Sequence, residues 1–350
     1  MATGAWPTLV DRASRIDGAG RQMRVAEMMS QHNDLWGYVP MMESSEIDGH
    51  LFAFRSSIPT GFWRQYNQGV PYAKSTTGKA KVGLGSLEGY SQVDKKLANH
   101  TGDPERFCKS EDAGFIEGMG QTMVQTWFYG NVTTNPAQFG GLSMFYNTVN
   151  PANAANAVNL LDGGGVASNN TSMWLLGFGE RSIFGLYPRG SKAGLQIIDH
   201  GTTRAAYDAL GNPFEAYTMY FSHDMGLCPM DWRYGVRYCN LDVTASGAGL
   251  AGPNAPDLFA NMATMIMMVP HATAQSSAIT NTDAYDDPAP AVRYAFMMDR
   301  TLRHWLEIQA MRNRNVLLGL NDYAGKPITT WRGIDIAICD QLLNTESRVV

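Results

Sequence analysis

The sequence predicts an α+β fold with one long helix in its first half and a strand-rich region in its second half. Three observations lead to this prediction. They are a capped stretch with helical apolar spacing at residues 103–129, two aromatic, near-alternating stretches at 173–188 and 216–243, and a second helical pattern at 255–270. With 350 residues, the chain can bury a sizeable core and form two domains or one elaborated domain.

Residues 1–48 read as an arm that needs another surface to lie on, because they contain no self-contained core. A short helix is predicted at 21–32, with Val25, Met28 and Met29 on one side. The alternative is a floppy terminus, which the cost of leaving Trp6, Trp36 and the methionines in water makes less favourable.

The stretch from residue 51 to 90 alternates apolar and polar residues around Phe52, Phe54, Phe62 and Tyr66, which predicts strands. A hairpin tip is predicted at 75–81, in the sequence STTGKAK. A stretch with so little core of its own is expected to pack on something else. We therefore expect a chain that lacks residues 51–90 to keep its folded core but to lose assembly.

The helix predicted at 103–129 has clear start and stop signals. Asp103 is a good N-cap, Pro104 suits the first helical position, and Gly130 ends the pattern. Three glycines inside the helix, at positions 114, 118 and 120, each lower its intrinsic stability by roughly 1 kcal/mol relative to alanine, so packing must hold it. Such small residues would also let another backbone come close.

The stretches 173–188 and 216–243 are predicted to be strands of one antiparallel sheet, and 189–201 a turn-bounded connector between them. Arg233 and Arg237 alternate with apolar residues, which places both on one strand face. Ion pairing in a subunit contact and simple solvent exposure both remain open for these arginines.

The last hundred residues read as an α/β or α+β unit that follows a linker at 244–255. Helices are predicted at 255–270, capped by Asp257 or Asn254, and at 291–312. Strands are predicted toward residue 338.

Charged residues make up only 17% of the chain, against roughly 25% in an ordinary soluble domain. The formal net charge is -5, which argues against a chain-wide basic footprint for nucleic acid. A surface with few charges is expected to meet a partner. The sequence shows neither a signal peptide nor a membrane-length apolar run, so we expect synthesis in the cytosol.

Motifs for catalysis, cofactors and metals are missing from the sequence. The four cysteines form no CxxC pair, the histidines form no HxxxH pair, and no GxSxG elbow occurs. The phosphate-loop pattern fails at Ala73 and Ala80. We therefore expect no catalytic, cofactor-binding or metal-binding residues, although an enzyme could still assemble a site from distant positions.

Several stretches in chain order resemble major capsid proteins of tailed bacteriophages, and among them most closely the group typified by the epsilon15 coat protein. The sequences that carry the resemblance are GMGQTMVQTWFYGN with NPAQFGGL, GLYPRGSKAGLQ, DWRYGVRYCNLD, APDLFANMA and WRGIDI. It covers about residues 20–345 and is strongest from 118 to 242.

The resemblance implies the Hong Kong 97-like capsid fold, also called the Johnson fold. Residues 1–48 would be the N-terminal arm and 49–100 the extended loop that reaches over a neighbour. Residues 101–249 would form the peripheral domain, with a spine helix at 103–129 and the sheet, and 250–350 the axial domain with C-terminal strands.

The implied function is that of a shell subunit, not an enzyme, which forms hexamers and pentamers of itself around double-stranded DNA in the virion capsid. The implied partners are a scaffold, a portal and a decoration protein, with assembly in the bacterial host cytoplasm, no membrane, and DNA held by enclosure. The residues expected at subunit interfaces are Trp6, Trp36, Phe62, Trp63, Arg64, Lys74, Lys79, Lys81, Arg233 and Arg237.

Some related shells carry crosslinks between Lys and Asn, but neither a catalytic carboxylate nor a partner asparagine can be assigned here, so we expect no crosslinking. The alternative to a shell subunit is a soluble enzyme or ligand-binding protein whose site is not recognisable from sequence.

Overall fold

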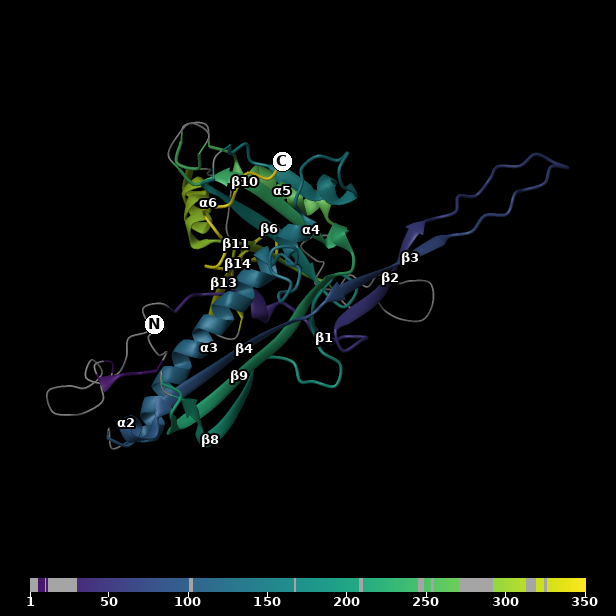
Figure 1. Cartoon of the computed structure of the whole chain (residues 1–350). Coiled ribbons are helices and arrows are strands. Elements are labelled where there is room, and N and C mark those ends of the chain that lie inside the picture. The colour runs from purple at the N-terminus through teal and green to yellow at the C-terminus, as the bar shows by residue number, and fades with distance from the viewer. Residues whose placement is uncertain are drawn as a thin grey trace.

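The computed structural model describes residues 6–9, 11, 30–100, 103–166, 168–207, 210–244, 249–252, 255–270, 292–312, 319–323 and 326–350. These residues form a body of helices and strands, from which one long hairpin projects to one side (Figure 1).

The predicted long helix is confirmed as α3, Pro104–Tyr129. The side chain of Asp103 accepts a hydrogen bond from the Arg106 amide at 3.1 Å, which caps the first turn. The helix ends at Gly130, whose amide donates to the Thr126 carbonyl. Its buried side chains lie mainly in its second half and include Met119, Met123, Val124, Trp127 and Phe128.

A large mixed sheet carries the fold. One path of neighbouring strands runs β12 (Gly319–Tyr323), β13 (Lys326–Trp331), β14 (Ile334–Ile338), β11 (Arg293–Met298), β6 (Asn170–Phe178), β7 (Ile183–Tyr187), β9 (Pro213–Pro229) and β4 (Gly85–Asp94). Off this path, β1 (Met41–Glu43) pairs with β7, β10 (Gly235–Asp242) pairs with β6 and with β5 (Leu160–Asp162), and β8 (Gln196–Tyr207) pairs with β9. The short helical elements are η1 (Asp34–Gly37), α2 (Lys95–Asn99), α4 (Leu142–Phe145), η2 (Ala155–Asn159) and η3 (Trp232–Tyr234).

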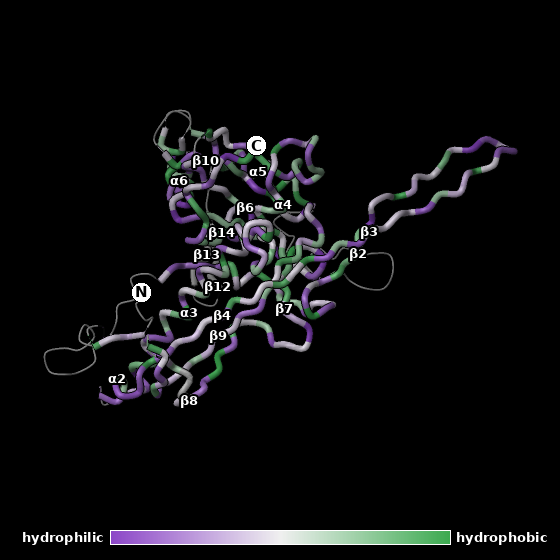
Figure 2. Tube along the Cα trace, viewed as in Figure 1, coloured by the Kyte–Doolittle hydropathy of each residue, from purple (hydrophilic) through white to green (hydrophobic). Residues whose placement is uncertain are grey.

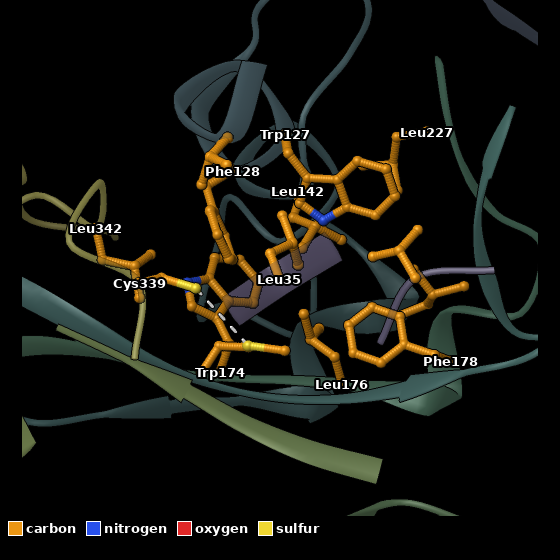
Figure 3. Packing of buried hydrophobic residues seen from close by; sticks show 14 of the residues in the cluster. Leu35, Trp127, Phe128, Leu142, Trp174, Leu176, Phe178, Leu227, Cys339 and Leu342 are labelled. Carbon is orange, nitrogen blue, oxygen red and sulfur yellow. Dashed lines mark hydrogen bonds between the residues drawn. The ribbon is translucent and has the colours of Figure 1, made fainter. Parts of the chain in front are cut away.

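Two hydrophobic cores lie on the two faces of β6, because successive side chains of a strand point to opposite sides. Trp174 and Leu176 belong to the core that contains Trp127 and Phe128 of α3 (Figure 3). Met173 and Leu175 belong to the second core, with side chains of α5 (Leu258–Met268) and α6 (Arg300–Arg312). All nine residues of β6 are buried, which explains the lack of alternation in its run from Met173 to Phe178.

The long strand β9 extends the sheet away from these two cores. Its residues 226–229 pair with β7, while residues 216–225 pair antiparallel with β4 and β8 flanks the other edge. The α3 helix covers this extension on one face, where the Phe115 ring stacks on Phe221 at 5.8 Å between ring centroids. The result is a lobe with one helix on one side of three strands.

The projecting hairpin is a separate two-stranded sheet of β2 (Gly49–Ser57) and β3 (Thr76–Gly83). Strands are confirmed around Phe52 and Phe54 but not around Phe62 and Tyr66, which lie between the two strands and outside both. The predicted tip at 75–81 is wrong, because Lys79 and Lys81 pair with Ala53 and Leu51 inside the ladder. The connection between the strands is the stretch 58–75 instead. Polar and small residues in STTGKAK therefore mark an exposed strand and not a turn.

Two predictions in the second half need correction. The helix predicted at 291–312 begins only at Arg300, since residues 293–298 form β11, whose last five residues are buried between the two cores. The connector predicted at 189–201 contains a turn and then the start of β8 at Gln196. The helix predicted at 255–270 is confirmed as α5, with Asp257 accepting from the Ala260 amide.

The sheet crosses the predicted domain boundary near residue 250, because β6 pairs with β10 before that boundary and with β11 after it. The assignment of 1–48, 49–100, 101–249 and 250–350 to separate domains stays a prediction. The helix predicted at 21–32 lies outside the described residues.

Candidate assembly interfaces

The stretch 58–75 exposes an unusual number of large apolar side chains. Trp63 and Tyr72 are fully exposed, and Tyr66 nearly so. The other large apolar residues exposed on it are Ile58, Phe62 and Val70. Figure 2 shows hydrophobic residues interspersed along this thin extension, far from the core of the body. So many large apolar side chains exposed within one segment indicate a site of protein contact.

The base of the hairpin is fixed to the body by packing. Phe52 and Val82, one from each strand, pack against a small core of Phe184, Leu186 and Cys228. The His50 ring meets the Phe184 ring edge-on at 5.9 Å. The hairpin therefore has a base that is packed on the body. We call its projecting part, residues 58–75, the free arm of the hairpin.

Lys81 forms ion pairs at the base of the hairpin. Its ammonium group lies 2.7 Å from a carboxylate oxygen of Glu46 and 3.0 Å from one of Asp48. The hydrogen bond to Glu46 chiefly raises the pKa of Lys81, and the hydrogen bond from Lys81 chiefly lowers the pKa of Asp48. Arg64, Lys74 and Lys79 are exposed and form no ion pair with any described residue.

Trp6 and Trp36 lie against the body of their own chain. The Trp6 indole donates to the Gln92 side-chain oxygen at 3.2 Å and meets the Phe214 ring edge-on. Trp36 meets Trp127 edge-on at 5.9 Å, at the margin of the core beneath α3. Both are half-buried in the single chain, and a further contact with another copy stays a prediction.

The prediction that Arg233 and Arg237 share one strand face is wrong. Arg233 lies in η3, exposed, with its guanidinium 2.7 Å from Asp231. Arg237 lies in β10, is 4% exposed and pairs with Glu346 at 2.9 Å. The turn at residues 232–234 breaks the alternation on which the prediction depended.

The buried Arg237–Glu346 pair sits in a polar network that sequence reasoning missed. The Arg237 guanidinium also donates to the Ser172 hydroxyl at 3.1 Å and the Tyr146 carbonyl at 2.8 Å. Tyr129 at the end of α3 donates its hydroxyl to Glu346. Burial and the Glu346 charge hold the pKa of Tyr129 well above its usual value, so that it remains a donor.

The C-terminal segment also forms hydrogen bonds with Asn240, which is fully buried in β10. Its side-chain amide accepts from the Val349 amide at 2.8 Å and donates to the Val349 carbonyl at 2.9 Å. One signal for this network existed in the sequence, because an arginine within an apolar strand requires an anionic partner. Nothing in the sequence indicated which acid would supply it.

Side chains that could support catalysis or metal binding do not converge in the described part of the chain. No three His, Cys, Asp or Glu residues there are grouped to hold a metal ion. Burial raises the pKa of the Cys108 thiol to about 11 and that of Cys228 to about 12, so neither is an activated nucleophile. Among the described helices, none is long and apolar enough to cross a membrane.

The family described as major capsid protein GP7 matches residues 17–350 of the sequence. The chain belongs to this family of major capsid proteins. No curated protein matches it. The family is structural, which indicates a role other than catalysis and disfavours the alternative of a soluble enzyme.

Three solved structures are similar to this chain over different shares of its length. The structure of bacteriophage epsilon15 matches with a TM-score of 0.75 and 28% identity, and the match covers 100% of this chain and 99% of that chain. The bacteriophage JBD30 capsid matches with a TM-score of 0.48 and 9% identity over 91% of this chain and 93% of that one. An encapsulin from Synechococcus elongatus matches with a TM-score of 0.42 and 12% identity over 69% and 98%.

The family match and the likeness to the epsilon15 structure confirm the predicted fold class, α+β with the Hong Kong 97-like capsid architecture. The protein is a major capsid protein of a bacteriophage head, and its place is the virion shell, built by self-association. Its spine helix is α3 and its extended hairpin is β2–β3.

Proposed function

We propose that this major capsid protein assembles into hexamers and pentamers, which close into the icosahedral head around the double-stranded DNA of the phage. The observation that carries the proposal is the free arm of the hairpin. Its aromatic side chains are exposed to water in the single chain, and contact with a neighbouring copy would bury them.

Repeated weak contacts suffice for a stable shell. A surface that binds a different surface of the next copy generates rings when the rotation closes. Each subunit then touches several others, so the contacts reinforce one another without any single tight interface. The hairpin, which reaches far from the body, suits such a contact (Figure 1).

DNA would be held by enclosure. The net charge of -5 leaves no general attraction to phosphate, and a closed shell needs none to confine its contents. We include a scaffold, a portal and a decoration protein as partners, and assembly in the cytoplasm of the bacterial host, as further parts of this proposal.

The test compares the wild-type chain with one whose hairpin is shortened. Removal of residues 51–90, expected from the sequence to spare the core, is unsuitable, because it would delete residues 85–90 of β4, which pair with β9 in the sheet. Residues 58–75 can instead be replaced by Asn-Gly, since Ser57 and Thr76 face each other in the ladder and suit a two-residue turn.

We expect wild-type protein to give shells, tubes or capsomers in sedimentation velocity and negative-stain images, and the shortened chain to stay monomeric. Circular dichroism should show the same helix content and melting temperature for both. Met311→Ala, which removes an exposed apolar side chain from α6, serves as the control and should assemble normally. Shells formed by the shortened chain would contradict the proposal.

A further inference from the structure

Arg332 has a backbone conformation that favours glycine and asparagine. Its φ is 50°, and that of Gly333 beside it is 78°. These two residues form the whole loop between β13 and β14, since Trp331 and Ile334 pair directly in the ladder. A two-residue loop with both φ angles positive normally holds Asn-Gly or Asp-Gly. The other non-glycine residues with positive φ in the described part of the chain are both asparagines.

The core holds the base of this loop in place. Trp331 is 7% exposed and belongs to the second core, where its ring lies 5.8 Å from that of Phe259 in α5 and 6.3 Å from that of Phe296 in β11. The Arg332 guanidinium lies over the Trp331 ring, 4.8 Å from its centroid, and Arg332 is exposed. Stacking uses the face of a guanidinium and leaves the N–H donors in its plane for another partner.

Arg332 differs from the arginines around it in lacking an anionic partner. All five arginines between residues 233 and 303 form an ion pair with an acid of their own chain. They are Arg233 with Asp231, Arg237 with Glu346, Arg293 with Asp335, Arg300 with Asp340 and Arg303 with Glu307. Arg332 forms no ion pair with any described residue. Asp335, the acid nearest to it in the sequence, is occupied by Arg293 at 2.9 Å and by the Tyr38 hydroxyl.

An arginine at this position is therefore strained without a compensating ion pair in the single chain. A residue with a Cβ is disfavoured at positive φ, and asparagine tolerates that conformation better than arginine does. Stacking on Trp331 offsets part of the strain, but it leaves the charge unpaired. Strained residues are concentrated where a side chain must be placed for a contact.

The chemistry of a guanidinium limits what that contact can be. Its planar set of donors matches the two oxygens of a carboxylate or of a phosphate. A carboxylate is favoured here, because each copy carries 32 acidic and 27 basic residues and so has acids to spare. Nucleic acid is bound by groups of cations, whereas Arg293 on the neighbouring strand is already neutralised by Asp335.

We propose that Arg332 is a subunit-contact residue, whose guanidinium forms an ion pair with a carboxylate of a neighbouring copy in the shell. This inference rests on the proposed assembly function. It adds a contact outside the hairpin and the chemistry of its partner. A cation that is held in place before contact loses little side-chain freedom on binding, so the pair contributes to affinity as well as to register.

The first test replaces Arg332 by asparagine and by lysine. Arg332→Asn suits the positive φ, and this gain offsets the lost stacking on Trp331, so the melting temperature of the free chain should stay within about 2 °C of wild type. We expect the concentration needed for assembly to rise by about tenfold. Arg332→Lys keeps the charge without the planar donors, and its assembly concentration should rise by about threefold.

Arg348→Asn is the matched control. It removes an exposed arginine that forms no ion pair with any described residue, changes the net charge equally, and lies outside the loop. This variant should assemble like wild type. An equal loss of assembly in the control would assign the effect to net charge and would overturn the proposal.

The second test identifies the partner. Shells are assembled from equal parts of isotopically labelled wild-type chain and unlabelled Arg332→Lys chain, and are treated with a carbodiimide. The reagent activates a carboxylate, the amine introduced at position 332 attacks it, and an amide forms while the reagent leaves as a urea. Mass spectrometry should find position 332 joined to an Asp or Glu of a labelled copy, and the unassembled mixture should lack this product.

The outcomes separate this inference from the shell function. If wild-type shells form, normal assembly of Arg332→Asn, or the absence of crosslinks from position 332 to another copy, would overturn the contact and leave the shell function intact. Normal assembly with weaker binding of duplex DNA would show that phosphate is the partner, and the proposal would be equally wrong. Failure of the wild-type chain to assemble would instead refute the shell function itself.

Discussion

The Arg237–Glu346 pair illustrates what a buried charge requires at the scale of single residues. Both side chains are 4% exposed, and the carboxylate also accepts from the Tyr129 and Ser172 hydroxyls. Three parts of the chain therefore meet at Glu346, namely the end of α3, the strands β6 and β10, and the C-terminal segment. Removing one partner would leave the other charge buried and unpaired.

We expect Glu346→Ala to lower the free energy of unfolding by about 3–5 kcal/mol. Glu105→Ala, which breaks the exposed pair with Lys109, should cost only about 0.3–0.5 kcal/mol. Urea denaturation of the unassembled chains measures both. A cost below about 1 kcal/mol for Glu346→Ala would show that the pair is not buried as described.

A second residue-scale prediction concerns Asp112 of α3, which is 8% exposed and whose Oδ1 lacks a hydrogen-bond partner among the described residues. Burial chiefly raises its pKa, and the Glu111 and Asp199 charges raise it further. A raised folded-state pKa means that the ionised group destabilises the fold, and this penalty is complete at pH values above the raised pKa.

Asp112→Asn should therefore stabilise the free chain at pH 7, and the gain should shrink as the pH falls toward the ordinary aspartate pKa. Denaturation midpoints at pH 7 and pH 4 test the sign. A gain that grows on acidification would contradict the assignment.

At the scale of elements, the glycines of α3 differ from what the sequence led us to expect. A Cβ at Gly114, Gly118 or Gly120 would have no neighbour within 4 Å, so no second backbone comes close to these positions among the described residues. The close approach lies just beyond the helix. A Cβ at Gly141 would lie 2.5 Å from the Gly130 nitrogen and 2.6 Å from the Thr126 carbonyl oxygen, where the turn returns to the helix end.

Gly118→Ala should thus raise the stability of the free chain by about 1 kcal/mol through helix propensity. Gly141→Ala should lower it, because backbone atoms would have to move. Thermal melting of the two variants beside wild type measures the difference, and the opposite order would refute this account of the turn.

The sequence revealed elements whose signals are local. Caps at Asp103 and Asp257 and apolar spacing were sufficient for α3 and α5. The apolar run at β11 was taken for part of a helix, because a strand buried on both faces has no alternation to distinguish it. The candidate interface was likewise predictable only where its signal in the sequence is local. A segment without a core indicated the arm with Phe62 and Trp63, whereas Glu346 pairs with an arginine 109 residues away and left no local signal.

At the scale of the whole molecule, the chain consists of a folded body and one projecting hairpin. The large aromatic residues of the stretch 58–75 are not covered by any described residue of their own chain. Neighbouring copies in a lattice would cover them. Maintaining this arrangement in a shell requires no covalent link between subunits.

Boiled shells should accordingly run as one band of 38.4 kDa on a denaturing gel. Exposed Lys74 and Lys79 are nucleophiles only when deprotonated, and no acid or asparagine on the arm is grouped with them. A ladder of multiples would show that subunits crosslink.

The most direct measurement of the central claim is a cryo-electron microscopy map of shells assembled from the wild-type chain. We expect the β2–β3 hairpin of each copy to lie against a neighbouring copy, with Trp63 and Tyr72 covered by that copy. An arm that lies on its own chain, or that projects into solvent in the closed shell, would contradict it.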